Sequence, residues 1–526
     1  MADATKDKHK TSSASIKELL ISLVISFTMA FIFRGFAIEG FEIPTGSMGP
    51  TLLGKHVLVI NPETGYRWVV GPKPTQLGVP PAPVQENVSV AGPMSGERID
   101  LARERLRGGD RLFVLKYLRG LYDPDRWDVV VFRAPHANSN YIKRLIGLPN
   151  EQLAIVDGDV FTHPLGEIPA GWDEPSWSIQ RKPEIVQRAV WQPMFDSSFT
   201  PPNPARRFRA PWIGEGSGWE GIRDARVYRY TRSAATSLAW DHENRPITDR
   251  TYYNDSGPPG GDHFPVSDVA TSLGIEPEDA GVSATVELEA RGMTFRASIE
   301  DSTIRLSRVM AGTEVAVEIE SSDFDGLEPG RVTNIEFWHA DQALWLFIDG
   351  KLVAGGPEDG AYELSPAERA AAATGRDWRT AAGIDGPATS SELSRPSTFV
   401  QPRLRWRFEG GPFALHRVRL DRDLHYKFTL RSDPPGIRGM HPTTPAMLDG
   451  DHFYFAGDNS PNSLDARMWD YTHPWIARSI EGGEPQHGLT HRDLVIGRAF
   501  VVYLPAPSRS GLLPFMFDFG RVRWVW

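Results

Sequence analysis

The chain has 526 residues, a formal net charge of −10 and no cysteine. The charge gives no support for nucleic-acid binding, which needs a basic face, and the lack of cysteine excludes disulfides, thiolate nucleophiles and cysteine-based zinc sites. One hydrophobic core seldom serves more than about 300 residues, so we expect more than one folded unit. The 43 prolines and 49 glycines favour short strands and many loops, which predicts a mainly β protein.

The N-terminal residues predict a membrane anchor. Residues 1–18 carry four lysines, and the apolar run at residues 19–38 that follows contains a single charge, Arg34. As a helix this run is roughly 30 Å long, enough to cross a bilayer, and the lysines before it predict a cytoplasmic N-terminus with all later residues outside. The alternative is a cleavable secretory peptide, but no A-x-A-like cleavage site follows.

Residues 39–166 are expected to form a first β-rich part. Short strand-like runs stand at His56–Ile60, Arg111–Leu115 and Asp128–Phe132. A stretch rich in proline and glycine, residues 61–108, interrupts them and is interpreted as a surface loop insertion.

Residues 167–430 are expected to form an inserted β-sandwich. Apolar residues alternate with polar ones along residues 286–289 and 295–300, and Val315, Val317 and Ile319 continue the pattern, as strands with one buried face do. Residues 335–338 and 344–348 predict a hairpin, followed by an Asp349-Gly350 turn. The run Phe347–Lys351 is similar to concanavalin/laminin-G-like jelly rolls. Ser365 with Glu368 predicts a capped helix in a loop.

Residues 431–526 return to strand-like segments and end in an aromatic-rich tail. Common catalytic signatures such as H-E-x-x-H, a P-loop or a G-x-S-x-G elbow are absent from the chain. Three clusters of polar residues remain as candidate sites.

The first cluster surrounds Ser47. Gly46 and Gly49 flank it and Pro44 and Pro50 set the turn, so the serine can be held exposed on rigid backbone a few residues beyond the expected anchor. An isolated serine in such a turn is most often an ordinary loop residue.

The second cluster, Tyr141–Pro149, contains Lys143 next to Ile142 in a strand-like run. Partial burial there would lower the pKa of the lysine, so that its neutral amine could act as the base that a serine nucleophile needs. Judged alone, Lys143 reads as a surface lysine beside Arg144.

The third cluster, Gly457–Arg467, is dense in polar residues. Asp465 and Arg467 could form a bidentate pair, and Ser463 could orient a lysine. A solvated turn would have the same composition.

The combination and order of these clusters resembles the motif boxes of type I signal peptidases. The matching segments are Pro44–Leu52, Arg126–Phe132, Tyr141–Pro149, Gly457–Arg467 and Val495–Ala499. The resemblance implies a Ser/Lys-dyad serine protease on the family's β catalytic core, with residues 431–526 as the second part of that core.

Site roles follow from the same resemblance, residue by residue. It implies Ser47 as nucleophile, Lys143 as general base, the Ser47 amide and Thr45 hydroxyl as oxyanion donors, and Ser463 as the group that holds the Lys143 amine. Asp465 and Arg467 would support that loop. The expected walls of the pockets for small substrate side chains are Ile43, Met48, Leu52, Tyr141 and Ile142. Ser460-Pro461 departs from the family's usual Arg-Asp, which puts a local turn in doubt.

The implied function is removal of signal peptides from secretory preproteins after small residues of the Ala-X-Ala type. It implies no metal or organic cofactor, no nucleic acid, and a single-pass location in a bacterial cytoplasmic membrane with the catalytic part outside. Phe36, Phe41 and the tail at residues 512–519 are hypothesised to dip into the bilayer.

The size of the insertion keeps other functions open. The chain could display a carbohydrate- or protein-binding β-sandwich, with an unidentified ligand, on a degenerate protease scaffold, although an intact Ser47 and Lys143 weigh against this. A spacer or docking domain without ligand is equally compatible with the sequence. A self-cleaving Ser/Lys repressor is disfavoured by the anchor and by the lack of a basic DNA-binding segment.

Overall fold

The structure is a computed structural model of the whole chain. It describes the residues 4–73, 81–116, 123–202, 208–255, 263–300, 302–310, 312–313, 315–377, 379–380, 395–427, 439–440, 445–505, 508–510, 513–516 and 522–526.

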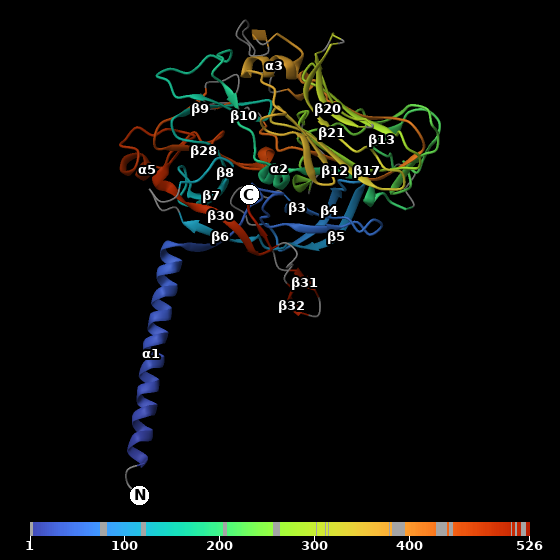
Figure 1. Ribbon diagram of the computed structural model, residues 1–526. Helices are drawn as coiled ribbons and strands as arrows, with labels where there is room; N and C mark the ends of the chain where they lie inside the picture. Colours follow the sequence, from blue (N-terminus) through green and yellow to red (C-terminus); the bar gives the residue numbers. More distant parts are fainter. Residues whose placement is uncertain are drawn as a thin grey trace.

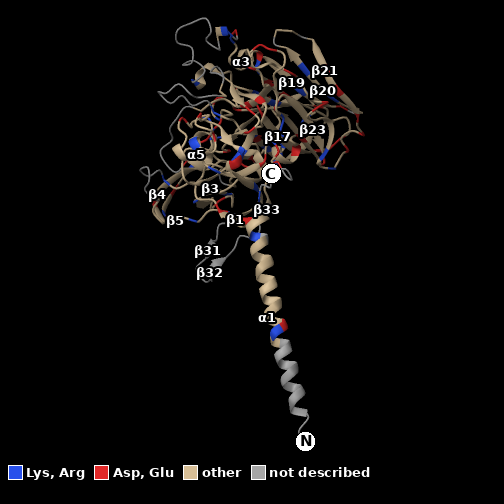
Figure 2. Cartoon of the chain, turned by 90° about the vertical axis from the view of Figure 1, so that its left-hand side faces the viewer, with Lys and Arg blue, Asp and Glu red and all other residues tan. Residues whose placement is uncertain are grey.

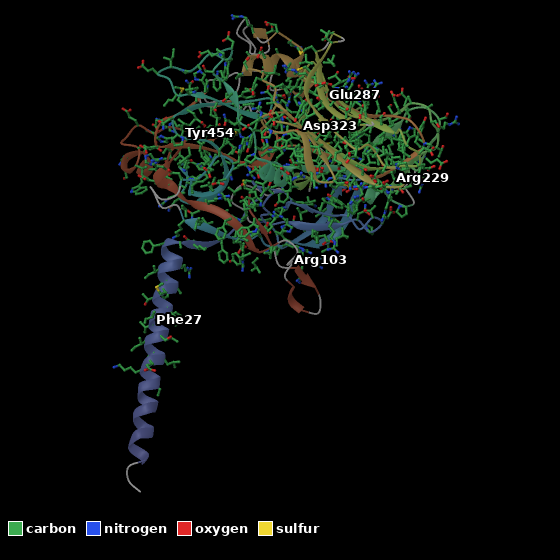
Figure 3. All side chains as sticks on the ribbon, viewed as in Figure 1. Phe27, Arg103, Arg229, Glu287, Asp323 and Tyr454 are labelled. Atoms are coloured by element: carbon green, nitrogen blue, oxygen red, sulfur yellow. The ribbon has the colours of Figure 1, made fainter. Side chains whose placement is uncertain are left out.

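The chain begins with a long helix, α1 (Ala4–Phe36), that projects from a β-rich body (Figure 1). Its segment Ile16–Phe36 has a mean hydropathy of 2.0 and is long and apolar enough to cross a membrane. Figure 2 shows an uncharged stretch along this helix, and in Figure 3 Phe27 lies on the helix outside the body whereas Tyr454 lies within it. The finding agrees with the expected anchor at residues 19–38 and is compatible with a membrane-anchored protein.

Strands from both ends of the chain meet in one antiparallel sheet, which we call the dyad sheet because it carries Lys143. Its order is β1 (Ile38–Glu42), β6 (Arg111–Lys116), β30 (Val495–Leu504), β7 (Val129–Arg133), β8 (Asn140–Gly147), β28 (His452–Ala456) and β29 (Thr490–His491), with β33 (Arg523–Trp524) paired to β30. The strands expected near residues 111–115 and 128–132 are β6 and β7.

A second, four-stranded sheet shares the core of the dyad sheet. Its order is β11 (Ser178–Ile179), β10 (Asp159–Pro164), β9 (Glu151–Val156) and β27 (Ala446–Leu448). Buried side chains of both sheets, such as Phe132, Leu145, Leu153 and Ile155, pack in one cluster. Helix α2 (Glu184–Val190) adds Val186 and Val190 to this cluster.

The segment expected as a loop insertion at residues 61–108 contains strands. Two antiparallel pairs form here, β2 (Val57–Ile60) with β3 (Arg67–Val70) and β4 (Val84–Ala91) with β5 (Arg98–Arg105). Val57, Trp68 and Val88 lie in their small common core. The loop interpretation was therefore wrong for β3, β4 and β5, because the surrounding prolines and glycines hid the short apolar alternation at residues 84–91, whereas β2 is the strand expected at His56–Ile60.

The insertion itself forms a β-sandwich from strands between Gln192 and Arg422 (Figure 1). One sheet has the order β14 (Trp219–Glu220), β15 (Val227–Tyr230), β26 (Phe413–Arg422), β17 (Val269–Pro277), β22 (Thr333–Ala340), β23 (Ala343–Ile348) and β24 (Lys351–Gly355), with β12 (Gln192–Asp196) also paired to β26. The other has the order β13 (Trp212–Gly214), β16 (Thr236–Trp240), β25 (Arg403–Glu409), β18 (Ser283–Ala290), β19 (Met293–Ile299), β20 (Thr303–Met310) and β21 (Ala316–Asp323). Their facing side chains form one large core, so the mainly β expectation is confirmed.

The expected hairpin is present, with a tighter turn than the sequence indicated. Strands β22 and β23 pair up to Ala340 and Ala343, so only Asp341 and Gln342 form the turn. Both have positive φ, 48° and 56°, as the tightest hairpin turns require. Asp349 and Gly350 form the expected turn before β24.

The expected buried face of the strand at residues 315–319 is wrong in part. Val315 is 72% exposed and Val317 is 47% exposed. The reason is topological, since β21 is the last strand of its sheet and pairs with β20 alone along the described sheet order.

The capped helix is confirmed as α3 (Pro366–Thr374), and it docks on the four-stranded sheet rather than lying in a free loop. Ser365 and Glu368 form the capping box. Arg369 is fully buried and pairs with Asp157 and Asp159 at the β9–β10 turn and with Asp268 before β17. This ion-pair cluster therefore joins the sandwich to the four-stranded sheet.

We predict that Arg369→Ala lowers the free energy of unfolding by about 3–5 kcal/mol, because it leaves Arg291 as the remaining buried arginine among Asp157, Asp159 and Asp268. The measurement is urea-induced unfolding of the full chain in detergent at pH 7. Arg331→Ala is the matched control, since Arg331 is 58% exposed in its pairs with Glu328 and Asp349 and should cost less than about 1 kcal/mol. Equal losses in the two variants would contradict the role of the cluster.

Candidate active site

Ser47 lies on a turn directly after β1, which we call the Ser47 loop (residues 43–52). The Gly49 N–H donates to Gly46 O at 3.0 Å, and the Leu52 N–H donates to Met48 O at 2.8 Å. Ile43, Met48 and Leu52 are at most 2% exposed and anchor the loop in the core under the dyad sheet. The apolar anchors thus hold the backbone while Ser47 stays half-buried at the surface.

Lys143 comes from the middle of β8, between β7 and β28. Its side chain is only 3% exposed. The Nζ atom donates to Ser47 Oγ at 2.6 Å and to Ile142 O at 3.1 Å. Two residues 96 positions apart in the sequence therefore meet at hydrogen-bond distance.

Burial lowers the pKa of Lys143 to about 8, and Arg467 acts in the same direction. Asp465 and Asp458 oppose the shift, since nearby negative charges stabilise the ammonium form. With a pKa of about 8, roughly a tenth of the molecules carry the neutral amine at pH 7. A lysine in that state can accept a proton from a hydroxyl within hydrogen-bond reach.

The Gly457–Arg467 segment folds against this pair as a buried polar loop. Arg467 donates to both carboxylate oxygens of Asp465, Nε to Oδ1 at 2.8 Å and Nη2 to Oδ2 at 2.7 Å. Burial raises the pKa of Asp465, but Arg467 and the Gly457 N–H outweigh it and the net pKa lies below the ordinary value. The carboxylate is therefore charged and fixed.

Ser460, which stands where the signal peptidase motif usually has arginine, connects the Gly457–Arg467 loop to Lys427. Its hydroxyl accepts from Arg467 Nη1 at 2.7 Å and from the Lys427 N–H at 2.6 Å. Ser460 is thus a buried, hydrogen-bonded residue.

The other expected site residues take different positions. Ser463 lies next to Gly457, where a methyl group added to the glycine would be 2.2 Å from its Oγ. Among the described residues, Ser463 and Lys143 make no hydrogen bond with each other. Thr45 is exposed on the Ser47 loop, and Tyr141 and Ile142 are half-buried on β8, whereas Ile43, Met48 and Leu52 face the core.

Arg144 is a buried residue that the sequence reading missed. It is fully buried, pairs with Asp458 through two hydrogen bonds of 2.8 and 2.7 Å, and donates to the carbonyl of Trp127 at 2.6 Å. Arg144 directly follows Lys143 in β8, and successive residues of a strand point to opposite faces of the sheet. Because both faces of this strand are covered, the apolar residues around the Lys143–Arg144 pair could have indicated that Arg144 is buried.

Two residues of the insertion, Tyr253 and Asn254, also reach the site. They lie in a short 3₁₀ turn, η2 (Tyr252–Asn254), between β16 and β17. The Tyr253 ring packs on Gly46 and Gly49, and Asn254 bonds Asn459 of the polar loop. No local sequence pattern marks them, since their partners lie 198 and 205 residues away.

The chain is similar to known signal peptidases over part of its length. The family described as "Signal peptidase, peptidase S26" matches residues 98–163, a segment that contains Lys143 but not Ser47. The signal peptidase I of Rickettsia bellii (strain OSU 85-389) is 26% identical over 156 residues, which are 30% of this chain and 41% of that protein. The signal peptidase I of Buchnera aphidicola subsp. Schizaphis graminum is 30% identical over 26% of this chain and 30% of its own length.

The likeness to solved structures is too low to support any statement. The carbohydrate-binding module CBM66 from Bacillus subtilis has a TM-score of 0.23 at 9% identity and covers 40% of this chain and 96% of its own. The laminarinase catalytic domain from Thermotoga maritima MSB8 has a TM-score of 0.26 at 8% identity and covers 45% and 100%.

This chain spans less than half the length of the curated relatives named above. Within that span the similarity includes the strand that carries Lys143. Over residues 98–163 the chain is therefore similar to the signal peptidases of the peptidase S26 family, and a large β-sandwich lies between this segment and the Gly457–Arg467 loop.

Proposed function

We propose that this protein is a membrane-anchored signal peptidase that removes N-terminal signal peptides from secretory preproteins. The observation that carries the proposal is the buried Lys143 amine 2.6 Å from the Ser47 hydroxyl. A lysine with a lowered pKa next to a serine on a rigid turn is the arrangement that activates a hydroxyl nucleophile.

The reaction has two halves. Neutral Lys143 takes the proton of Ser47 Oγ as the oxygen attacks the scissile carbonyl, and the tetrahedral intermediate forms with a negative oxygen. Lys143 then returns the proton to the leaving amine, which leaves an acyl-enzyme on Ser47. A water molecule attacks the ester as Lys143 takes its proton, and Lys143 then returns that proton to Ser47 Oγ as the acyl group leaves. No metal or organic cofactor takes part.

The oxyanion donors of this proposal are the Ser47 N–H and the Thr45 hydroxyl. The Ser47 N–H makes no hydrogen bond to another described residue, and Thr45 is exposed on the same loop. Both are therefore free to bind a substrate oxygen. Ser463 is proposed to hold the Lys143 amine, while Asp465 and Arg467 keep that loop in place.

The anchor explains where substrate would meet the site. Ser47 follows Phe36, the last residue of α1, by a few residues of β1 and turn. A site this close to the membrane surface suits a signal peptide whose cleavage point emerges from the bilayer. We propose that Tyr141 and Ile142 contact the small residues before the cut, with Ile43, Met48 and Leu52 shaping the floor beneath them.

Phe36 and Phe41 lie at this end of the molecule, and Phe36 is 67% exposed. The tail proposed to join them, residues 512–519, lies outside the described residues except for the backbone of β32 (Leu513–Met516).

The alternative of a ligand-binding sandwich on a degenerate protease is less well supported. A degenerate site has no need to keep the Lys143 amine buried beside Ser47, because an unused ammonium group there costs stability.

Ser47→Ala and Lys143→Ala are each expected to lower the rate of preprotein cleavage by about 10³-fold or more, because nucleophile and base act as a unit. The assay follows a model preprotein with an Ala-X-Ala site in detergent micelles. Ser139→Ala and Lys351→Ala are matched controls at exposed positions and should cleave like wild type. A wild-type protein that does not cleave, or a Ser47 variant that does, would refute the proposed function.

The pH dependence follows from the pKa of Lys143, about 8. Because only the neutral amine accepts a proton, kcat/KM should rise through pH 8 and fall about tenfold per unit well below it. Asp465→Asn removes a charge that raises this pKa, so its midpoint should move to lower pH. A midpoint near 10, the ordinary range of lysine, would contradict a desolvated base.

A further inference from the structure

The η2 turn of the sandwich reaches across to the Ser47 loop and packs on its glycines. A methyl group built on Gly46 would lie 2.2 Å from Tyr253 Cε1, and one on Gly49 would lie 3.1 Å from the same ring. Tyr253 is 3% exposed, its carbonyl accepts from the Gly71 N–H at 2.7 Å, and its hydroxyl donates to Lys55 O at 3.0 Å. The ring is thus held by its hydroxyl and by the main-chain bond of its own residue, and it leaves Gly46 and Gly49 no room to shift toward it.

Asn254 contacts the same loop through one intermediate residue, Asn459. The two side-chain amides exchange hydrogen bonds of 2.7 and 2.8 Å. Asn459 is fully buried, and it donates to two successive carbonyls, those of Gly46 and of Ser47 itself. Its Nδ2 bonds Gly46 O at 2.8 Å and its backbone N–H bonds Ser47 O at 3.0 Å.

The hydrogen bond to Gly46 O has a consequence for catalysis. A trans peptide group is planar, and its C=O and N–H point in opposite directions. Gly46 O also accepts from the Gly49 N–H within the Ser47 loop, so Asn459 and Gly49 together fix the direction of the Ser47 N–H, which is the proposed oxyanion donor. The orientation of Asn459 in turn depends on its amide pair with Asn254.

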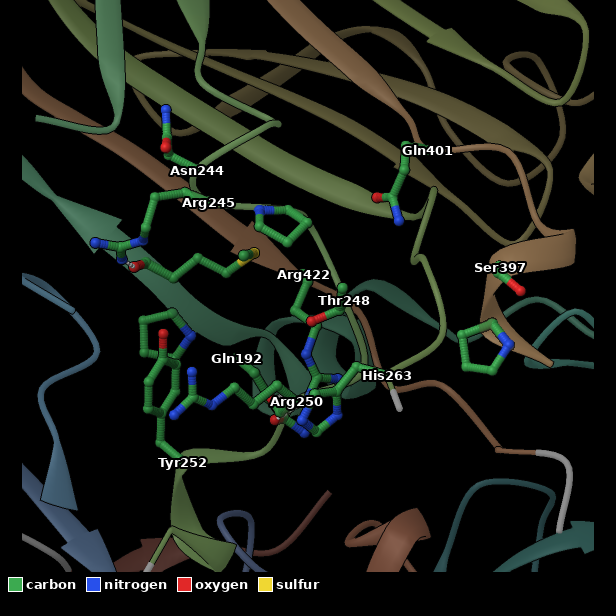
Figure 4. A pocket seen from close by; sticks show the side chains of 14 residues that line it. Gln192, Asn244, Arg245, Thr248, Arg250, Tyr252, His263, Ser397, Gln401 and Arg422 are labelled. Atoms are coloured by element: carbon green, nitrogen blue, oxygen red, sulfur yellow. Dashed lines mark hydrogen bonds between the residues drawn. The ribbon is translucent and has the colours of Figure 1, made fainter. Parts of the chain in front are cut away.

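A cavity of about 450 Å³ lies next to the η2 turn and is lined by Tyr252 and by several arginines (Figure 4). At its back Arg422, 3% exposed, donates to the carbonyls of Asp249 and Arg250 and to Thr251 Oγ1 at 3.0–3.2 Å. Arg250 pairs with Asp255, and Arg245 donates to main-chain carbonyls. Arg422 and Arg250 thus bind the chain on either side of the turn, whereas Arg245 binds the carbonyls of Pro93 and Met194, and we assign these cationic groups a supporting role.

We propose that Tyr253 and Asn254 are positioning residues for the peptidase site, so that the inserted β-sandwich completes the active site instead of only being attached to it. Tyr253 sets the position of the Ser47 loop by packing, and Asn254 sets the direction of the Ser47 N–H through Asn459. This inference rests on the proposed peptidase function for its kinetic consequences.

The test compares kinetics of Asn254→Ala, Tyr253→Ala and Tyr253→Phe in the full chain in detergent. Asn254→Ala should lower kcat about tenfold and leave KM within about threefold, because misdirecting an oxyanion donor costs part of the 10²–10³-fold of losing one. Tyr253→Ala should lower kcat further, and Tyr253→Phe should restore most of that loss, since the ring is kept. Asn244→Ala is the matched control, an exposed asparagine of the same domain whose side chain bonds Asp241.

A double-mutant cycle tests the route through Asn459. If Asn254 acts through Asn459, the Asn254→Ala/Asn459→Ala variant should be no slower than Asn459→Ala alone. Effects that multiply in full, or an Asn254→Ala variant with the kcat of Asn244→Ala, would overturn the proposal.

Hydrogen–deuterium exchange separates this inference from the proposed function. Peptides that contain residues 45–53 should exchange faster in Asn254→Ala and Tyr253→Ala than in wild type or Asn244→Ala, whether or not any variant cleaves a preprotein. Unchanged exchange in both variants would overturn the positioning role, whereas a wild-type protein without cleavage activity would refute only the proposed function.

Discussion

The burial of one amine, Lys143 Nζ, beside Ser47 Oγ is the constraint on which the dyad sheet and the loops around it depend. An ammonium ion is costly to remove from water, and that cost is what lowers its pKa to about 8. Lys143 is kept from water because it lies in the middle of β8, which is flanked by β7 and β28 in the sheet. The nearby charges come in pairs, Asp465 with Arg467 and Asp458 with Arg144, so neither sign dominates around the amine.

This arrangement requires three distant parts of the chain to be folded at once. Ser47 comes from the N-terminal end, Lys143 from the first part of the core, and the polar loop from the last quarter of the sequence. The long insertion between Lys143 and the polar loop must therefore begin and end close to the site. Buried ion pairs at α3 and at Lys182 with Asp341 and Asp423 fix the sandwich against the core. We infer that they set the geometry from which η2 reaches the site.

The sequence indicated the elements whose determinants are local, and it failed where they are not. Short runs of alternating apolar and polar residues predicted sandwich strands, and the capping box of Ser365 and Glu368 predicted α3. The motif boxes brought Ser47 and Lys143 together because both stand in recognisable local patterns. The exposure of Val315 and Val317 could not be predicted, because alternation does not reveal which strand ends a sheet. Tyr253 and Asn254 were beyond reach as well, since their role exists only through contacts about 200 residues away.

The contact of η2 with the Ser47 loop changes how the insertion has to be studied. Insertions are tolerated best at exposed loop tips that share little surface with their host, and a domain of that kind could be deleted without harm to catalysis. Here deletion of residues 167–430 would also remove the ring that covers Gly46 and Gly49 and the amide that holds Asn459. It would leave a void beside the nucleophile and an unpaired buried amide, each of which costs stability by itself. Loss of activity after such a deletion therefore cannot distinguish a lost binding function from a disordered Ser47 loop, and point substitutions in η2 are the changes that can.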